Sequence, residues 1–244
     1  MFKDKDIFLF DLDGTLLGIE AEEFLKHYFT ALSAEFKDLC AEPDKFIQIL
    51  MGSTEKMIRN DGSRSNQKAF MEDFIEKMEI SNQNEAEKIK SRFEDFYQTK
   101  FVDLGQHFEI DRKTPAEIIE YLKAKGKRLV LATNPLFPEE AVEARLGWIG
   151  IDAADFELLT HYENMSYAKP NPNYYREILA KMNVEPENCL MIGNDLKEDA
   201  VASELGIKTL IIEDRIIKRE NSDFDIAWQG RLKDFKELLK EKLE

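Results

Sequence analysis

Residues 7–15 read IFLFDLDGT, and the fold predicted for this chain follows from this segment. Its first four residues are all apolar, which is typical of a strand buried on both faces of a parallel sheet. Asp11 and Asp13 follow where that strand stops, and Gly14 permits a tight turn. Active sites of open α/β sheets lie at the carboxyl ends of their strands. The stretch therefore predicts a buried first strand with a candidate active site directly after it.

Three further apolar runs, at 128–132, 189–192 and 209–212, have the same character. Segments with helical spacing of apolar residues separate them or follow them, including one that continues from Leu196 to Leu205. The box Thr114-Pro115-Ala116-Glu117 predicts a helix start at Thr114. Strands that alternate with helices predict an α/β fold with a doubly wound, mainly parallel sheet covered on both faces.

The segment 17–105 has a different pattern. Its apolar residues follow helical spacing throughout, no clear strand interrupts them, and Asn82 is expected to cap the last helix. We therefore predict a core domain formed by residues 1–16 and 106–244, with a smaller all-helical domain inserted at 17–105.

The stretch from Met51 to Lys56 is interpreted as a turn in this insertion. Ser53, Thr54 or Lys56 would then face the active site. An ordinary helix-helix connection is the alternative.

Composition excludes several classes of protein. The chain of 244 residues has 49 acidic and 34 basic side chains and a net charge of -15, which disfavours nucleic acid and anionic membranes as partners. No apolar stretch approaches the length of a membrane span, and the N-terminal apolar run is too short for a signal peptide. Cys40 and Cys189 are expected to be free thiols in a reducing cytoplasm, with a disulfide as the poorer alternative.

Asp11 and Asp13 can divide the work of a phosphoryl transfer. One carboxylate can attack phosphorus while the other moves a proton to and from the ester oxygen. A surface turn is one alternative, and a calcium-binding EF-hand loop is another. The EF-hand pattern requires Gly at its sixth position, where this chain has Leu16, so only part of it fits.

Three more polar motifs follow predicted strands. Thr133 and Asn134 can bind a phosphoryl oxygen or simply open a turn. Lys169 stands in the stiff loop AKPNP, 168–172, and is either a positioned positive charge or a solvated loop lysine. The motif GNDLKED, 193–199, holds carboxylates that could bind a hard cation or cap a helix. Because all these motifs lie near the carboxyl ends of strands, we expect them to meet at one sheet edge, where a divalent cation would relieve the repulsion among the carboxylates.

With these four motifs in this order, the chain resembles the haloacid dehalogenase (HAD) superfamily. The resemblance extends over the whole chain, and the helical insertion looks like the family's C1-type cap. It implies that Asp11 is the nucleophile and that Asp13 is the general acid and base. Lys169 would steady the charge, and Thr133 and Asn134 would bind the phosphoryl group.

The resemblance also implies a Mg²⁺ cofactor. Its ligands would be Asp11, the backbone carbonyl of Asp13, and Asp195. The chain departs here from relatives that have Gly-Asp, so Asn194 or Asp199 could share or replace the role of Asp195.

The expected function is a Mg²⁺-dependent phosphatase that hydrolyses a small phosphorylated metabolite through an aspartyl-phosphate. Asp13 favours the phosphatase and mutase branch, because dehalogenases of the superfamily lack this second aspartate. A sugar phosphomutase is the alternative with the same chemistry, and a non-catalytic binding protein that retains the fold is the alternative from another class. The resemblance implies a monomer or homodimer.

Overall fold

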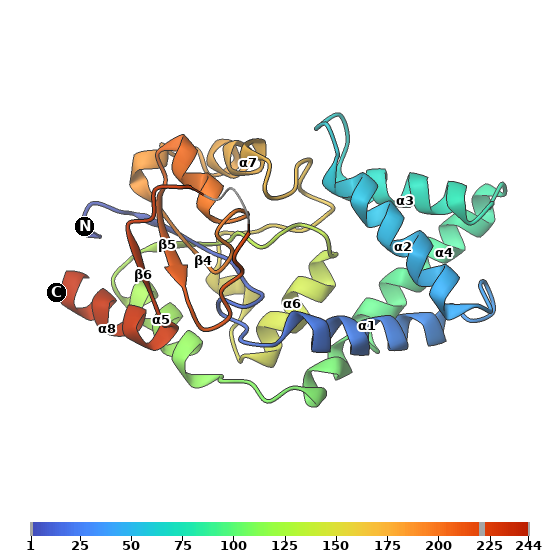
Figure 1. Ribbon diagram of the computed structural model, residues 1–244, viewed down its shortest axis with the longest axis horizontal. Helices are drawn as coiled ribbons and strands as arrows, with labels where there is room; N and C mark the ends of the chain where they lie inside the picture. The colour runs from blue at the N-terminus through green and yellow to red at the C-terminus, as the bar shows by residue number, and fades with distance from the viewer. Residues whose placement is uncertain (1, 220–222, 244) are drawn as a thin grey trace.

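The computed structural model describes residues 2–219 and 223–243 and divides into a sheet-containing core and a group of helices beside it (Figure 1). The core contains one six-stranded sheet of order β3-β2-β1-β4-β5-β6 in which every neighbouring pair is parallel. Both ends of the chain lie on the core side of the molecule (Figure 1). The predicted α/β fold class is confirmed.

The four central strands coincide with the predicted apolar runs. They are β1 (Ile7–Phe10), β2 (Arg128–Leu131), β4 (Cys189–Gly193) and β5 (Lys208–Ile212). The two edge strands, β3 (Leu158–Leu159) and β6 (Trp228–Gly230), were not predicted. These strands are too short to show a periodic pattern, so only their pairing with β2 and β5 identifies them.

Alternating side chains of each strand enter separate apolar clusters on the two faces of the sheet. Phe8 and Phe10 pack with residues of α5 (Lys113–Ala124) and α8 (Leu232–Leu243). Ile7 and Leu9 pack on the other face with residues of α7 (Pro172–Met182). This burial on both faces explains why β1 is apolar at every position.

The remaining helical segments of the core are shorter. They are α6 (Glu139–Trp148) and the 3₁₀ turns η2 (Ala153–Asp155), η3 (Pro186–Asn188) and η4 (Ala200–Leu205). The segment after β4 was predicted to open a helix with the spacing of Leu196 to Leu205. Residues 194–199 instead form turns, and only the 3₁₀ helix η4 follows.

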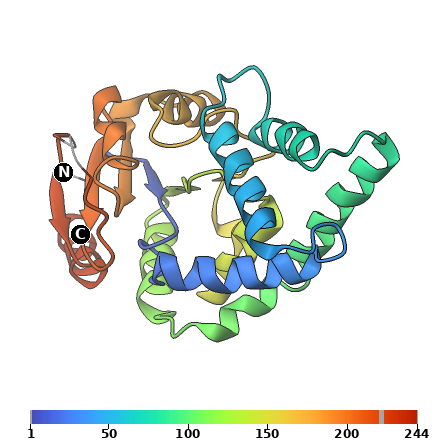
Figure 2. The same cartoon turned by 45° about the vertical axis from the view of Figure 1, so that its right-hand side comes forward.

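The insertion consists of helices. They are α1 (Ala21–Glu35), α2 (Pro43–Ile58), α3 (Asn66–Lys77), α4 (Gln83–Gln98) and the 3₁₀ helix η1 (Val102–His107). Helix α1 leads away from the core, and α2, α3 and α4 lie at the far side, as Figures 1 and 2 both show. The all-helical character of this smaller part is as predicted.

Local predictions in the helices had mixed outcomes. Asn82 is the N-cap of α4, and its side chain accepts a hydrogen bond from the Asn84 N–H at 2.9 Å, which confirms that prediction. The predicted helix start at Thr114 is wrong, because α5 begins one residue earlier and Asp111 accepts from the N–H groups of its first turn. The predicted turn at 51–56 is also wrong, since this stretch lies inside α2.

No helix in the described ranges is long and apolar enough to cross a membrane. Cys40 and Cys189 are both free, as predicted, and Cys189 is buried in β4.

Candidate active site

The carboxyl ends of β1, β2 and β4 lie side by side because the three strands are parallel and paired in register. The register continues one residue further, since the Asp11 N–H donates to the Ile192 carbonyl at 2.8 Å and the Ala132 N–H donates to the Phe10 carbonyl at 2.7 Å. Asp11, Thr133 and Asn194 therefore leave the sheet at the same edge.

Asp11, Lys169 and Asp199 form a buried charged cluster at this edge. The Lys169 Nζ lies 2.9 Å from Asp11 Oδ1 and 2.6 Å from Asp199 Oδ1. The second oxygen of Asp199 accepts the N–H groups of Asn194 and Asp195, each at 2.9 Å. Because Asp199 is bonded on both sides, it fixes Lys169 beside Asp11.

Burial shifts the ionisation of this cluster. Desolvation by burial is the main cause that raises the pKa of Asp11 to about 8. The positive charge of Lys169 opposes this shift, and the negative charge of Asp199 adds to it. Burial by itself lowers the pKa of Lys169, but the charges of Asp11 and Asp199 outweigh it, so the pKa of Lys169 lies well above its ordinary value. The raised pKa means that Asp11 keeps its proton up to a higher pH than an ordinary aspartate, and an added positive charge would favour its ionised form.

The turn after Asp11 brings Asn194 against Thr15. Thr15 Oγ1 lies 3.3 Å from Asp11 Oδ2 and 3.2 Å from Asn194 Oδ1. Gly14 has φ +82°, and a Cβ at this position would lie 2.2 Å from the Asn194 amide nitrogen. Glycine is therefore needed both for the backbone conformation and for the close approach of Asn194.

Asp13 is paired with Arg145, a residue that the sequence analysis did not consider. Asp13 Oδ2 accepts from Arg145 Nη1, while Asp13 Oδ1 and Arg145 Nη2 have no hydrogen-bond partner within the described residues. Arg145 is fully buried, donates from Nε to the Ala141 carbonyl at 3.0 Å and stacks over the Phe137 ring at 4.6 Å. Asp13 thus has one oxygen paired with Arg145 and one buried oxygen without a partner among the described residues.

Asp195 is engaged differently from the prediction that it would be the third acidic ligand of a metal. One of its oxygens accepts the N–H groups of Lys197 at 2.8 Å and Glu198 at 2.9 Å. Its other oxygen lies 2.6 Å from the Arg219 guanidinium, which also contacts Glu198 at 2.8 Å. Its neighbour Asn194, and not Asp195, lies beside Thr15.

Thr133 and Asn134 lie at the same edge. The Thr133 carbonyl accepts from the hydroxyls of Thr160 at 2.7 Å and Tyr174 at 2.8 Å, which anchors the loop after β2. The Asn134 amide accepts from the Lys169 N–H at 3.2 Å and donates to Glu198 at 2.9 Å. The side chain of Asn134 therefore connects three motifs.

The structure thus brings Asp11, Lys169 and Asp199 into direct contact and turns the carboxylates of Asp13 and Asp195 toward arginines. Arg145 was overlooked because a single arginine in a helix reads as a surface residue. It is buried with Ala141 and Leu146, but α6 has no marked apolar face in its sequence, so the sequence offered no clear signal for Arg145.

The donor atoms fit a hard cation in part. Within residues 2–219 and 223–243, no three His, Cys, Asp or Glu side chains are arranged to hold a metal ion. The Asp11 carboxylate and the Asn194 amide oxygen, on either side of the Thr15 hydroxyl, are nevertheless the oxygen ligands that Mg²⁺ accepts, and Mg²⁺ usually takes only one or two carboxylates. When both Asp11 and Asp199 are ionised, their two negative charges exceed the single positive charge of Lys169 by one, and a cation would neutralise that excess.

An α/β core with a buried carboxylate paired with a lysine at a strand end defines the class of this site. The model of the haloacid dehalogenase-like hydrolases matches residues 5–205, so this chain belongs to that family. This confirms the resemblance seen in the four motifs.

Curated relatives match only part of the chain. A glyceraldehyde 3-phosphate phosphatase of Methanothermobacter thermautotrophicus is 27% identical over 48% of this chain and 54% of its own length. A phosphoglycolate phosphatase of Colwellia psychrerythraea is 37% identical over 34% of this chain and 35% of its own. The chain thus spans less than two thirds of either relative.

Solved structures match over nearly the full length. A 2-haloacid dehalogenase of Pseudomonas syringae pv. Tomato has a TM-score of 0.66 at 20% identity, with 98% of this chain and 99% of that chain covered. A HAD phosphatase of Thermococcus onnurineus has a TM-score of 0.60 at 16% identity, with 96% and 97% covered. At these identities the likeness shows the shared fold.

Proposed function

We propose that this chain is a Mg²⁺-dependent phosphatase that hydrolyses a small phosphomonoester through a phosphorylated Asp11. The observation that carries the proposal is the contact of Asp11 with Lys169 at a strand end, with a second acid, Asp13, two residues further on the same loop. The curated relatives are named as phosphatases, which supports the same reaction class.

In the first step, an oxygen of Asp11 attacks phosphorus and the bond from phosphorus to the ester oxygen breaks. Lys169 stabilises the negative charge that is shared between Asp11 and the phosphoryl oxygens. Asp13 gives its proton to the departing oxygen, which leaves as an alcohol. The Asp13 side chain is 43% exposed, so its carboxyl group is open to a substrate, although Oδ1 itself is buried.

In the second step, water attacks the phosphorus of the aspartyl-phosphate, and Asp13 accepts a proton from that water. The bond from phosphorus to the Asp11 oxygen breaks, so that inorganic phosphate is released and the carboxylate is regenerated. Thr133, at the same edge as Asp11, is proposed to bind a phosphoryl oxygen during both steps.

We assign the cation to Asp11 and the Asn194 amide oxygen, with the backbone carbonyl of Asp13 as a further ligand. Mg²⁺ bound there would neutralise charge on the phosphoryl oxygens and on Asp11. Asp195 could bind the cation only if it gave up its ion pair with Arg219, so Asn194 is the preferred ligand.

The presence of Asp13 favours an ester over an organic halide as substrate. A halide departs as a stable anion and needs no proton, whereas an alkoxide is a poor leaving group unless an acid protonates it. A general acid next to the nucleophile is therefore useful only for the ester.

The test is release of inorganic phosphate from ethyl phosphate with Mg²⁺, compared between the wild type and Asp11→Asn. We expect the variant to lose at least about 10⁴-fold in turnover, as expected for removal of a nucleophile. EDTA should abolish the wild-type activity, and added Mg²⁺ should restore it.

Asp152→Asn is the matched control, because it makes the same change at an exposed N-cap in the core, where asparagine caps equally well. Wild-type turnover in Asp11→Asn would refute the proposal. Formation of an isomer without free phosphate from a sugar phosphate would replace it with a mutase.

A further inference from the structure

Two cavities meet between the core and the helical insertion. The larger, about 530 Å³, includes Asp13 and Asn194 in its wall and is therefore the active-site cleft. The smaller, about 250 Å³, lies among the helices of the insertion. Leu25 and Phe137 line both, so the small cavity, which we call the cap cavity, lies next to the cleft.

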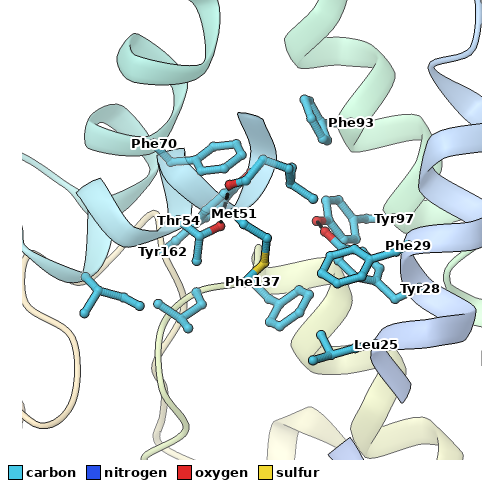
Figure 3. A pocket seen from close by; sticks show the side chains of 13 residues that line it. Leu25, Tyr28, Phe29, Met51, Thr54, Phe70, Phe93, Tyr97, Phe137 and Tyr162 are labelled. Atoms are coloured by element: carbon cyan, nitrogen blue, oxygen red, sulfur yellow. Dashed lines mark hydrogen bonds between the residues drawn. The ribbon is translucent and has the colours of Figure 1, made fainter. Parts of the chain in front are cut away.

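The walls of the cap cavity come from several elements. Helix α1 contributes Leu25 and Tyr28, helix α2 contributes Met51, and the loop after β2 contributes Phe137 (Figure 3). Phe137 lies only three residues after Asn134 in the same loop. Its ring also stacks under Arg145, the partner of Asp13. The cap cavity thus lies next to the catalytic loop as well as to the cleft.

The lining of the cap cavity has no charged side chain among its described residues. The hydroxyls of Tyr28 and Tyr97 lie 2.7 Å apart and bond each other, and Thr54 donates to the Leu50 carbonyl of its own helix at 2.9 Å (Figure 3). These polar atoms already have partners inside the protein. A carboxylate or a second phosphate placed here would lose its hydration without gaining a counter-charge.

Large apolar side chains are exposed at these two cavities. Among the described residues, four large apolar side chains are substantially exposed: Leu25 at 36%, Met51 at 47%, Ile217 at 38% and Val102 at 44%. The first three line one or both cavities, and only Val102 lies elsewhere. Covering such side chains with an apolar group is favourable, so the exposure marks a site for an apolar ligand.

The larger cleft offers one guanidinium near the cap cavity, that of Arg215. Its Nε lies 2.6 Å from Glu20, and its Nη1 donates to the Asp214 carbonyl at 2.9 Å. A carboxylate on the substrate would therefore have to compete with Glu20 for this cation.

We propose that the cap cavity binds the organic part of the substrate, and that this part is an aliphatic chain or an aromatic ring. This inference rests on the proposed phosphatase function. The size is sufficient, because an apolar cavity of roughly 150 Å³ accommodates a benzene ring. The substrate class is thus a phosphomonoester of an apolar alcohol, and phosphorylated acids such as 2-phosphoglycolate are disfavoured.

The test compares ethyl, butyl and hexyl phosphate, whose leaving alcohols are of similar basicity, with 2-phosphoglycolate. We expect kcat/KM to rise about two- to fourfold for each added methylene group that enters the cavity. The value for 2-phosphoglycolate should not exceed that for ethyl phosphate.

Met51→Gln tests the assignment to the cap cavity, and Val102→Gln is its matched control. Both change an exposed apolar side chain to the same amide, but only Met51 lines the cavity. The ratio of kcat/KM for hexyl over ethyl phosphate should fall about three- to tenfold in Met51→Gln, the loss of a few methylene contacts. It should stay at the wild-type value in Val102→Gln.

A flat alkyl series, or a preference for 2-phosphoglycolate, would overturn the apolar assignment while hydrolysis of ethyl phosphate still supported the phosphatase. Absence of hydrolysis for all four esters would instead refute the proposed function. In that case, calorimetry of the binding of hexylphosphonate and ethylphosphonate to the Mg²⁺-loaded chain tests whether the cap cavity binds an apolar group, independently of hydrolysis. Tighter binding of hexylphosphonate with a negative heat-capacity change supports it, and equal affinity overturns it.

Discussion

The charged cluster at the sheet edge and the cap cavity are chemically opposite. The sheet edge holds three buried ionisable side chains, Asp11, Lys169 and Asp199. Each lies within hydrogen-bonding distance of another member of the cluster. In the cap cavity the lining is apolar, and its exposed side chains, such as Met51, have no charge. Under the proposed function, we expect the core to bind the phosphoryl group and the insertion to bind the organic part of the substrate.

The two regions should also respond differently to substitution. Removing one member of the charged cluster leaves a buried charge without its partner, which costs more than the pair itself contributes. Replacing an exposed apolar side chain of the cap cavity, such as Met51, changes chiefly the apolar area available to a ligand. Substitutions in the cluster should therefore affect turnover and stability together, whereas those in the cavity should affect selectivity.

Lys169→Met should have the largest effect. It leaves Asp11 and Asp199 buried without a cation, so we expect kcat to fall by about 10²–10³-fold and the free energy of unfolding to fall by about 3–5 kcal/mol. Steady-state kinetics and urea denaturation measure the two effects. Lys181→Met is the control, because this partly exposed lysine in α7 makes only a helix-surface pair with Glu177, and a change above about 1 kcal/mol there would contradict the comparison.

Arg145→Met should have a smaller effect, because the side chain of Asp13 is 43% exposed and water can replace its partner. We expect kcat to fall by about 10–100-fold, the range for misplacing a catalytic group. If Arg145 acts by positioning Asp13, the double variant Asp13→Asn/Arg145→Met should turn over no more slowly than Asp13→Asn alone. Fully additive losses would show an independent role for Arg145.

The charged cluster should titrate, and the cap cavity should not. Burial raises the pKa of Asp11 to about 8, and the nucleophile acts only when ionised, so kcat/KM should fall as pH decreases through that value when Mg²⁺ is scarce. Mg²⁺ favours the ionised carboxylate and should move this acidic limb to lower pH. For each pH unit by which the limb moves, kcat/KM at pH 7 should rise by up to about tenfold.

The measurement is a pH profile at low and at saturating Mg²⁺ for ethyl and hexyl phosphate. The selectivity ratio of the two esters should stay constant with pH. An acidic limb that does not move with Mg²⁺ would count against Asp11 as a ligand of the cation.

Tyr28→Phe should have the smallest effect on catalysis. It leaves the buried Tyr97 hydroxyl without its partner at 2.7 Å, so the free energy of unfolding should fall by about 1–3 kcal/mol. The double variant Tyr28→Phe/Tyr97→Phe should recover most of that loss and keep the preference for hexyl phosphate. Loss of that preference in the double variant would show that the hydroxyls bind the substrate.

Much of the fold was predictable from local pattern. A strand buried on both faces must be apolar at every position, so β1, β2, β4 and β5 could be located from sequence, whereas the short edge strands β3 and β6 could not. The capping interaction of Asn82 was predictable because it involves neighbouring residues. The start of α5 was not, because Asp111 accepts the N–H groups of Lys113 and Thr114 and the helix begins ahead of Thr114.

The motifs alone predicted which polar groups gather at one sheet edge, because parallel strands end together and the motifs follow those ends. The partner of each group became known only with the fold: Asp13 pairs with Arg145, Asp195 pairs with Arg219, and Asn194 lies beside Thr15. The same holds for the cap cavity, whose lining comes from separate helices. Strand and helix patterns arise from neighbours along the chain, whereas ion pairs and cavities depend on side chains that only folding brings together.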